Sequence, residues 1–113
     1  MKRVILESPF GGKTKAEIEA NINYARLCVR DCLKRGETPF ASHLLFAQPG
    51  ILNDKKTAER NFGMEAGFAW RITADATVVY KDKGISPGML KGIKDARKKG
   101  CPVEYRNLPN YSS

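Results

Sequence analysis

Apolar positions along the chain form two alternating patterns: compact apolar runs, and longer stretches in which apolar residues recur at helical spacing. The compact runs predict strands at 3–7, 38–41, 76–80 and 102–105, and the spaced stretches predict helices at 15–35, 55–72 and 88–99. The resulting order, β-α-β-α-β-α-β, predicts one α/β domain over residues 1–113 with a small parallel sheet of about four strands and helices on both faces. The polar tail at 107–113 is expected to be loosely ordered.

Capping residues support the helix boundaries. Thr14 and Glu17 have the spacing of a capping box, and Gly36 follows the expected end of the first helix. Asp54 can cap the second helix and Ser86 the third.

Composition indicates a globular chain. Apolar residues make up 42% of it, and no apolar run approaches the ~18 residues that a membrane span requires. Glu7 interrupts the first apolar run before it reaches the length of a signal peptide. We therefore expect a cytoplasmic protein without membrane partners.

The three cysteines do not form the even-numbered set of a disulfide framework. Cys28 and Cys32 share one helix face and, with His43, could suggest metal binding. Burial of two small side chains explains the pair better, because no second Cys/His pair completes a four-ligand site. No metal or cofactor is expected.

The formal net charge of +8 favours polyanionic partners. Much of the positive charge belongs to one predicted helix and is typical of a solvated outer face, although attraction of phosphate is compatible with it. Nucleic-acid recognition is not expected, because no binding motif occurs and aromatic residues do not alternate with basic ones. The basic residues of this helix are Lys91, Lys94, Arg97, Lys98 and Lys99.

Ligands of parallel α/β sheets bind beyond the C-terminal ends of the strands, near the point where strand order reverses. This rule selects the loops 8–14, 42–54 and 81–88. In the first, the backbone N–H groups could contact a phosphate or ribose, or the segment is only a tight turn. It is not a P-loop, because Leu6 and Glu7 stand where the first glycine is needed. The candidate ligand-binding residues here are Ser8, Pro9, Phe10, Gly11 and Gly12.

The second loop contains Ser42 and the single histidine, His43, with Gln48 further along. His43 could bond a base or phosphate, act as an acid or base, or be structural. The segment 44–46 either extends the preceding strand or begins an irregular stretch.

The third loop contains residues that could bind a nucleotide-like ligand, or it is only a capped turn. Asp82 could accept hydrogen bonds from a ribose, and the backbone near Gly88 could bind an anion at a helix N-terminus. The candidates are Asp82, Ser86, Gly88 and Met89.

Glu65 lies between Gly63 and Gly67, whose missing side chains fall on one helix face and permit close approach. Its carboxylate could be partly buried with a raised pKa, or it could face solvent or pair with Arg60 or Arg71.

Five motifs together resemble the nucleoside 2-deoxyribosyltransferase-like superfamily, over about residues 3–106, and more closely a group of small phage-type domains within it. The motifs are Glu-Ser-Pro-Phe at 7–10, Asn-Tyr-Ala-Arg at 23–26, Pro-Phe-Ala-Ser-His at 39–43, Gly-Met-Glu-Ala-Gly at 63–67 and Ser-Pro-Gly-Met at 86–89.

The resemblance implies a flavodoxin-like three-layer sandwich and homo-oligomers that share sites. It also implies cleavage of N-glycosidic bonds by a glutamate that attacks the anomeric carbon. In related domains that glutamate lies four residues after the glycine of a Ser-x-Gly pattern. Ser86 and Gly88 match the pattern, but Gly92 occupies the glutamate position.

Two hypotheses follow. The first is a non-catalytic protein that binds a nucleotide or nucleotide-derived molecule, and that in a phage would sequester an immune signal in the host cytoplasm. The second is an N-glycosidase or deoxyribosyltransferase with a relocated carboxylate, Glu65 or Glu7. A protein-binding scaffold is a third and weaker option.

Overall fold

A computed structural model describes residues 1–111. The elements in chain order are β1 (Lys2–Glu7), α1 (Lys15–Lys34), β2 (Glu37–Phe40), α2 (Ser42–Phe46), α3 (Thr57–Ala69), the 3₁₀ turn η1 (Trp70–Thr73), β3 (Ala76–Tyr80), α4 (Pro87–Lys98) and β4 (Val103–Arg106). The alternation predicted from apolar spacing is confirmed, and β3 has the predicted bounds.

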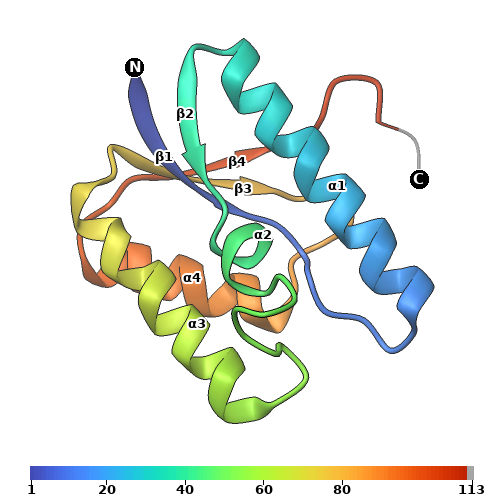
Figure 1. Ribbon diagram of the computed structural model, residues 1–113. Coiled ribbons are helices and arrows are strands. Elements are labelled where there is room, and N and C mark those ends of the chain that lie inside the picture. The colour runs from blue at the N-terminus through green and yellow to red at the C-terminus, as the bar shows by residue number, and fades with distance from the viewer. Residues whose placement is uncertain (112–113) are drawn as a thin grey trace.

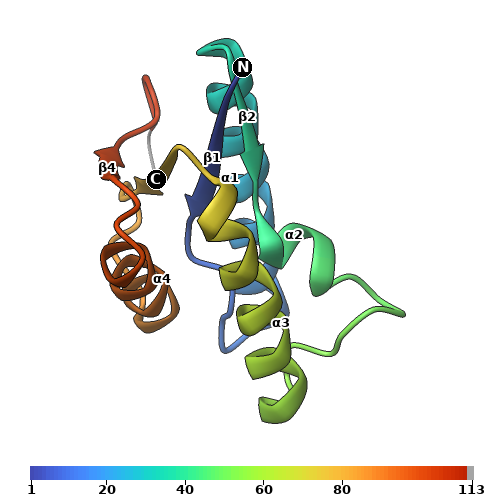
Figure 2. The ribbon, with the colours of Figure 1, turned by 90° about the vertical axis from the view of Figure 1, so that its left-hand side faces the viewer.

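The four strands form one parallel sheet in the order β2-β1-β3-β4. The chain moves outward from β1 to β2, crosses back to β3 and continues to β4, so strand order reverses between β1 and β3. This is the flavodoxin-like arrangement, whose ligands bind at that switch point. Figure 1 shows α1 on one side of the strands and α3 with α4 on the other, and in Figure 2, a quarter turn away, α1 lies behind the strands and α3 toward the viewer.

Successive side chains of each strand point alternately toward α1 and toward the layer of α3 and α4. On the α1 side, one apolar cluster contains Val4, Leu6, Ala76, Val78 and Tyr80 of the sheet with Tyr24, Cys28 and Cys32 of the helix. On the α4 side, Val79 packs with Met89 and Ile93. Because Leu6 points toward α1, the next residue, Glu7, points toward the layer of α3 and α4, where its contacts lie.

The predicted caps of α1 and α4 are confirmed. The Thr14 hydroxyl accepts from the Glu17 N–H at 3.1 Å, and the Glu17 carboxylate accepts from the Thr14 N–H. Gly36 follows the helix at φ +80°, which suits glycine. The Ser86 hydroxyl accepts from the Met89 N–H at the start of α4.

The region between β2 and α3 departs from expectation. Residues 44–46 neither extend the strand nor are irregular: they belong to α2. Asp54 does not cap α3, which begins after Lys56 without a side-chain cap. The helix is also shorter than predicted and tightens into η1 at Trp70, because the chain must turn there toward β3.

Both helical cysteines are fully buried against the sheet, as the packing interpretation predicted. The basic residues of α4 are exposed. In the tail, Leu108 and Tyr111 pack against the α1-side cluster, while residues 112–113 of the predicted loose segment lie outside the described residues. Within residues 1–111, no helix combines the length and apolar character needed to cross a membrane.

Candidate functional site

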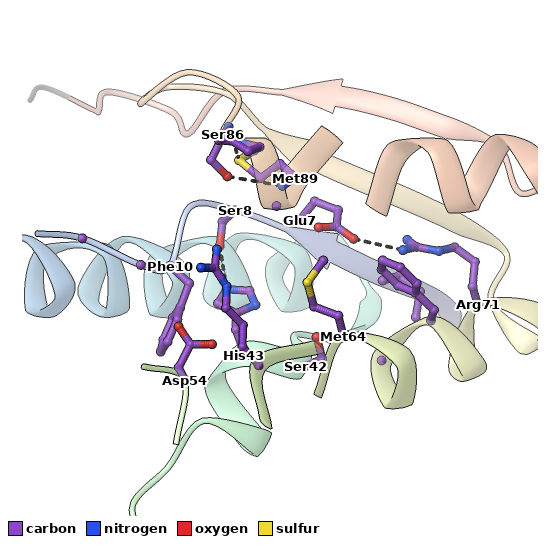
Figure 3. A pocket seen from close by; sticks show the side chains of 18 residues that line it. Glu7, Ser8, Phe10, Ser42, His43, Asp54, Met64, Arg71, Ser86 and Met89 are labelled. Atoms are coloured by element: carbon purple, nitrogen blue, oxygen red, sulfur yellow. Dashed lines mark hydrogen bonds and ion pairs between the residues drawn. The ribbon is translucent and has the colours of Figure 1, made fainter. Parts of the chain in front are cut away.

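A cavity of about 290 Å³ lies where β1, β2 and β3 end, at the switch point of the sheet (Figure 3). Its walls come from the loops after the three strands, from α3 and η1, and from the start of α4. The lining residues are Ile5, Glu7, Ser8, Phe10, Gly11, Gly12, Ser42, His43, Asp54, Arg60, Met64, Gly67, Phe68, Arg71, Ser86, Pro87, Gly88 and Met89.

Ser8 and His43 form a hydrogen-bonded pair across the ends of β1 and β2. The distance between Ser8 Oγ and His43 Nε2 is 2.9 Å. The His43 ring packs edge-on against Phe10, with 5.2 Å between ring centroids. Burial lowers the pKa of His43 to about 4, so the imidazole is neutral at physiological pH. The pair can therefore accept or donate hydrogen bonds without adding charge.

Glu7 and Arg71 form a buried ion pair on the opposite wall. Arg71 Nη2 lies 3.1 Å from Glu7 Oε2, while Arg71 Nε and Nη1 donate to Asp95 and Thr77 at 3.0 and 2.9 Å. The Arg71 side chain is fully buried, and 15% of the Glu7 side chain is exposed. Three acceptors on three elements thus fix the guanidinium, which in turn fixes Glu7.

The pKa of Glu7 is raised to about 7, chiefly because burial penalises the charged carboxylate. Arg71 opposes this shift, but its positive charge is shared with Asp95, and Asp95 itself raises the pKa of Glu7. Burial therefore outweighs the ion pair, and Glu7 titrates near neutrality.

The Glu7 carboxylate packs against α4 at Gly92. A Cβ atom on Gly92 would collide with the Glu7 carboxylate, so the absent side chain leaves the space that this carboxylate occupies. Position 92 is where the family resemblance places an attacking glutamate. The Glu7 carboxylate, which comes from β1, therefore lies against the α4 backbone at this position, in the space that a Cβ would need.

The loop after β1 is held from α1. The Asn21 side-chain amide donates to the carbonyl of Gly11 at 2.9 Å, and Lys83 Nζ donates to the Asn21 side-chain oxygen at 2.8 Å. Gly12 packs against α1 so closely that a Cβ would lie 2.7 Å from Glu17 Cβ. These contacts fix the backbone of Gly11 and Gly12 at the edge of the cavity.

Most of the sequence-predicted site residues meet around this cavity. Glu7 also lines it, whereas Glu65 is exposed on α3 outside it. The predicted ligand-binding residues that line it are Ser8, Phe10, Gly11, Gly12, Ser42, His43, Ser86, Gly88 and Met89.

Three predicted ligand-binding residues are not part of the cavity lining. Pro9 is buried without lining the cavity, and the Gln48 amide donates to the carbonyl of Leu44. Asp82 accepts hydrogen bonds from Tyr24 Oη and from the Leu108 N–H, so its carboxylate ties the tail to α1. That carboxylate is engaged by donors of the protein and lies outside the cavity lining.

Sequence reasoning did not identify several of the lining residues, above all Arg71. An arginine after an apolar helix carries no signal of burial, because its partners come from distant elements. The close approach predicted for the glycine pair did point to this region: a Cβ on Gly67 would lie 2.7 Å from Ser42 Oγ. Residues 1–111 contain no cluster of His, Cys, Asp and Glu suited to a metal ion.

The chain has the fold of nucleoside deoxyribosyltransferase-like proteins. Its structure is similar to that of a 2-deoxyribosyltransferase from the psychrotolerant bacterium Bacillus psychrosaccharolyticus, with a TM-score of 0.60 and 19% sequence identity. The match covers 98% of this chain and 76% of the other. The flavodoxin-like fold predicted from the resemblance is thereby confirmed.

The chain belongs to the family described as Domain of unknown function (DUF7768), whose model matches residues 2–106. No curated protein matches the chain.

Proposed function

We propose that this protein binds a nucleotide or nucleotide-derived small molecule in the switch-point cavity. The proposal depends chiefly on one observation: the cavity combines apolar and aromatic walls with a few fixed polar groups. Phe10 and Phe68 offer faces for a base, and Ser8 and Ser86 offer hydroxyls. Arg60 and the loop of Gly11 and Gly12 offer groups for a phosphate. The volume suits one nucleoside unit better than a dinucleotide.

The surroundings of Glu7 favour binding over catalysis. Position 92 is a glycine, and Oε2 of the neighbouring Glu7 carboxylate accepts a hydrogen bond from Arg71. A carboxylate attacks in its ionised form, and a pKa near 7 leaves Glu7 only partly ionised at neutral pH. A protein that binds without cleaving would sequester its ligand.

Our proposal extends to the biological setting. A phage-encoded copy of such a binding protein would act in the host cytoplasm, as a homo-oligomer, on a nucleotide-type immune signal. The support is the family resemblance together with the net charge of +8, which favours anionic ligands.

Isothermal titration calorimetry against nucleosides, nucleoside monophosphates and cyclic nucleotides tests the binding function. Saturable heat with at least one ligand is expected, and Ser8→Ala should weaken it by about 2- to 10-fold because one hydrogen bond is lost. Glu65→Gln is the control, because Glu65 is exposed on α3 and does not line the cavity. This variant should bind as the parent protein does. Absence of heat across the panel would exclude the proposal.

A second candidate function, cleavage of an N-glycosidic bond, is favoured by the Glu7 carboxylate in the space above Gly92. A Glu7 oxygen would bond to the anomeric carbon as the C–N bond breaks, and the base would leave with the electron pair and take a proton from solvent. Water would then release the sugar and restore the carboxylate.

Chromatography of deoxynucleosides and their monophosphates after incubation with the protein tests this second function. If it holds, free base accumulates, Glu7→Gln abolishes the release, and Glu65→Gln leaves it unchanged. Base release that survives Glu7→Gln, or no release at all, would remove the enzyme hypothesis and leave binding untouched.

A further inference from the structure

One oxygen of the Glu7 carboxylate, Oε1, is accessible from the cavity. Arg71 binds Oε2, and no residue among 1–111 makes a hydrogen bond to Oε1. Glu7 lines the cavity and its side chain keeps 15% exposure, so this oxygen is not sealed in the core. An acceptor presented to a cavity in this way is available to a hydrogen-bond donor of a ligand.

The position of that oxygen is set from two sides. Arg71 is itself held by Asp95 and Thr77, so Oε2 has a fixed anchor. Gly92 bounds the carboxylate on the α4 side, where any side chain would displace it. A side chain restrained on both sides loses little conformational freedom when a ligand binds, and it therefore discriminates strongly between ligands.

The other groups facing Glu7 decide which ligand group fits. Arg71 is already paired with two carboxylates, and His43 across the cavity is uncharged at neutral pH. No unpaired cation is therefore next to Glu7 among the cavity residues that the structure describes, so a phosphate placed beside it would be repelled. A neutral donor, such as a sugar hydroxyl, fits this wall, and Arg60 is left to attract an anionic end.

We propose that Glu7 determines ligand specificity by accepting, through Oε1, a hydrogen bond from a ribose hydroxyl, with Arg71 as its positioning residue. This inference rests on the proposed binding function and refines it: the ligand class is a ribonucleotide or ribonucleoside, bound with its sugar against β1 and α4.

A thermodynamic cycle, in which a hydroxyl is removed from the ligand and the Glu7 carboxylate is removed from the protein, tests this contact. Affinities are measured for the four common ribonucleoside 5′-monophosphates and for their 2′-deoxy and 3′-deoxy analogues. At a pH of about 8.5, where Glu7 with its pKa of about 7 is ionised, removing the contacted hydroxyl should weaken binding to the parent protein by about 10-fold or more, because hydrogen bonds to charged groups are strong. In Glu7→Ala the same removal should change affinity by less than about 2-fold.

Gly92→Ala is the second variant, and it keeps the Glu7 charge while displacing the carboxylate. It should also abolish the hydroxyl preference, and it gives the answer if Glu7→Ala leaves Arg71 too poorly paired for folding. Glu19→Gln, a carboxylate change on the exposed side of α1, should keep the full preference.

The outcomes separate this inference from the function on which it rests. If no nucleotide binds the parent protein, both fail. If nucleotides bind but neither deoxy analogue is weaker, or if the loss persists in Glu7→Ala and Gly92→Ala, the Glu7 contact is wrong and the binding function stands.

Discussion

At the scale of single residues, Glu7 and His43, which both line the cavity, have opposite effects on stability as pH changes. Glu7 has a pKa raised to about 7, so the native state holds its proton more tightly than the unfolded chain does. His43 has a pKa lowered to about 4, so the unfolded chain binds its proton more tightly. Stability from Glu7 is lost as pH rises, whereas stability from His43 is lost as pH falls.

Glu7→Gln isolates the first of these effects. The contribution of Glu7 is fully present below its unfolded pKa of 4.5 and is lost as pH rises through about 7. Between those values the free energy of unfolding of the parent protein should therefore fall by roughly 3 kcal/mol relative to Glu7→Gln. Urea unfolding at several pH values measures the difference, and the His43 effect cancels because both proteins contain it. Parallel pH profiles would show that burial does not raise this pKa.

At the scale of elements, the cavity depends on how closely α3 approaches α2. Gly67 is buried at this contact, where a Cβ would meet the Oγ and Cβ atoms of Ser42. Ser42 begins α2 and lines the cavity, next to His43. A shift of α2 would therefore move Ser42 and His43. Gly67 thus affects the cavity indirectly, because it permits the close packing of α3 against α2.

Gly67→Ala should lower the free energy of unfolding by about 1 kcal/mol, because overpacking costs about 1–3 kcal/mol and the better helix propensity of alanine returns about 1. Gly63→Ala is the matched control one turn earlier, where the nearest atom is the flexible end of Leu52 at 3.2 Å. That variant should be neutral or slightly more stable. Equal effects of the two substitutions in chemical denaturation would contradict the close approach.

At the scale of the whole molecule, charge and topology act together. The net charge of +8 attracts anions from solution, while the cavity lining itself is balanced: it contains Glu7 and Asp54 together with Arg60 and Arg71. The basic residues of α4 lie on its exposed face and not in the cavity lining. The charge is therefore expected to affect the rate of encounter more than the contacts in the bound state.

Varying the salt concentration distinguishes long-range attraction by the net charge from contacts made in the bound state. Association rate constants for a nucleoside monophosphate should fall several-fold as ionic strength rises and the screening length drops below ~10 Å. The matching uncharged nucleoside should associate at a rate nearly independent of salt. Stopped-flow measurements with both ligands check this, and identical salt dependence would show that long-range attraction plays no part.

The sequence by itself determined the four strands, the three longer helices and the edge of the sheet where the candidate site lies. Apolar spacing located β3 and α1, and Thr14 and Glu17 fixed a helix start, because these signals depend on neighbours a few residues apart. The rule for parallel sheets then selected the loops that contain Ser8, His43 and Ser86, and these residues do meet around one cavity.

Only the tertiary structure decided which side chains share a space. It removed Asp82 and Glu65 from the cavity, brought in Arg71, and placed the Glu7 carboxylate where Gly92 has no side chain. These juxtapositions join residues 24 to 85 positions apart, through parallel register and crossover connections that no local pattern encodes. The sequence shows only that residue 92 is a glycine, and the packing of α4 against β1 shows that the Glu7 carboxylate fills the space beside it.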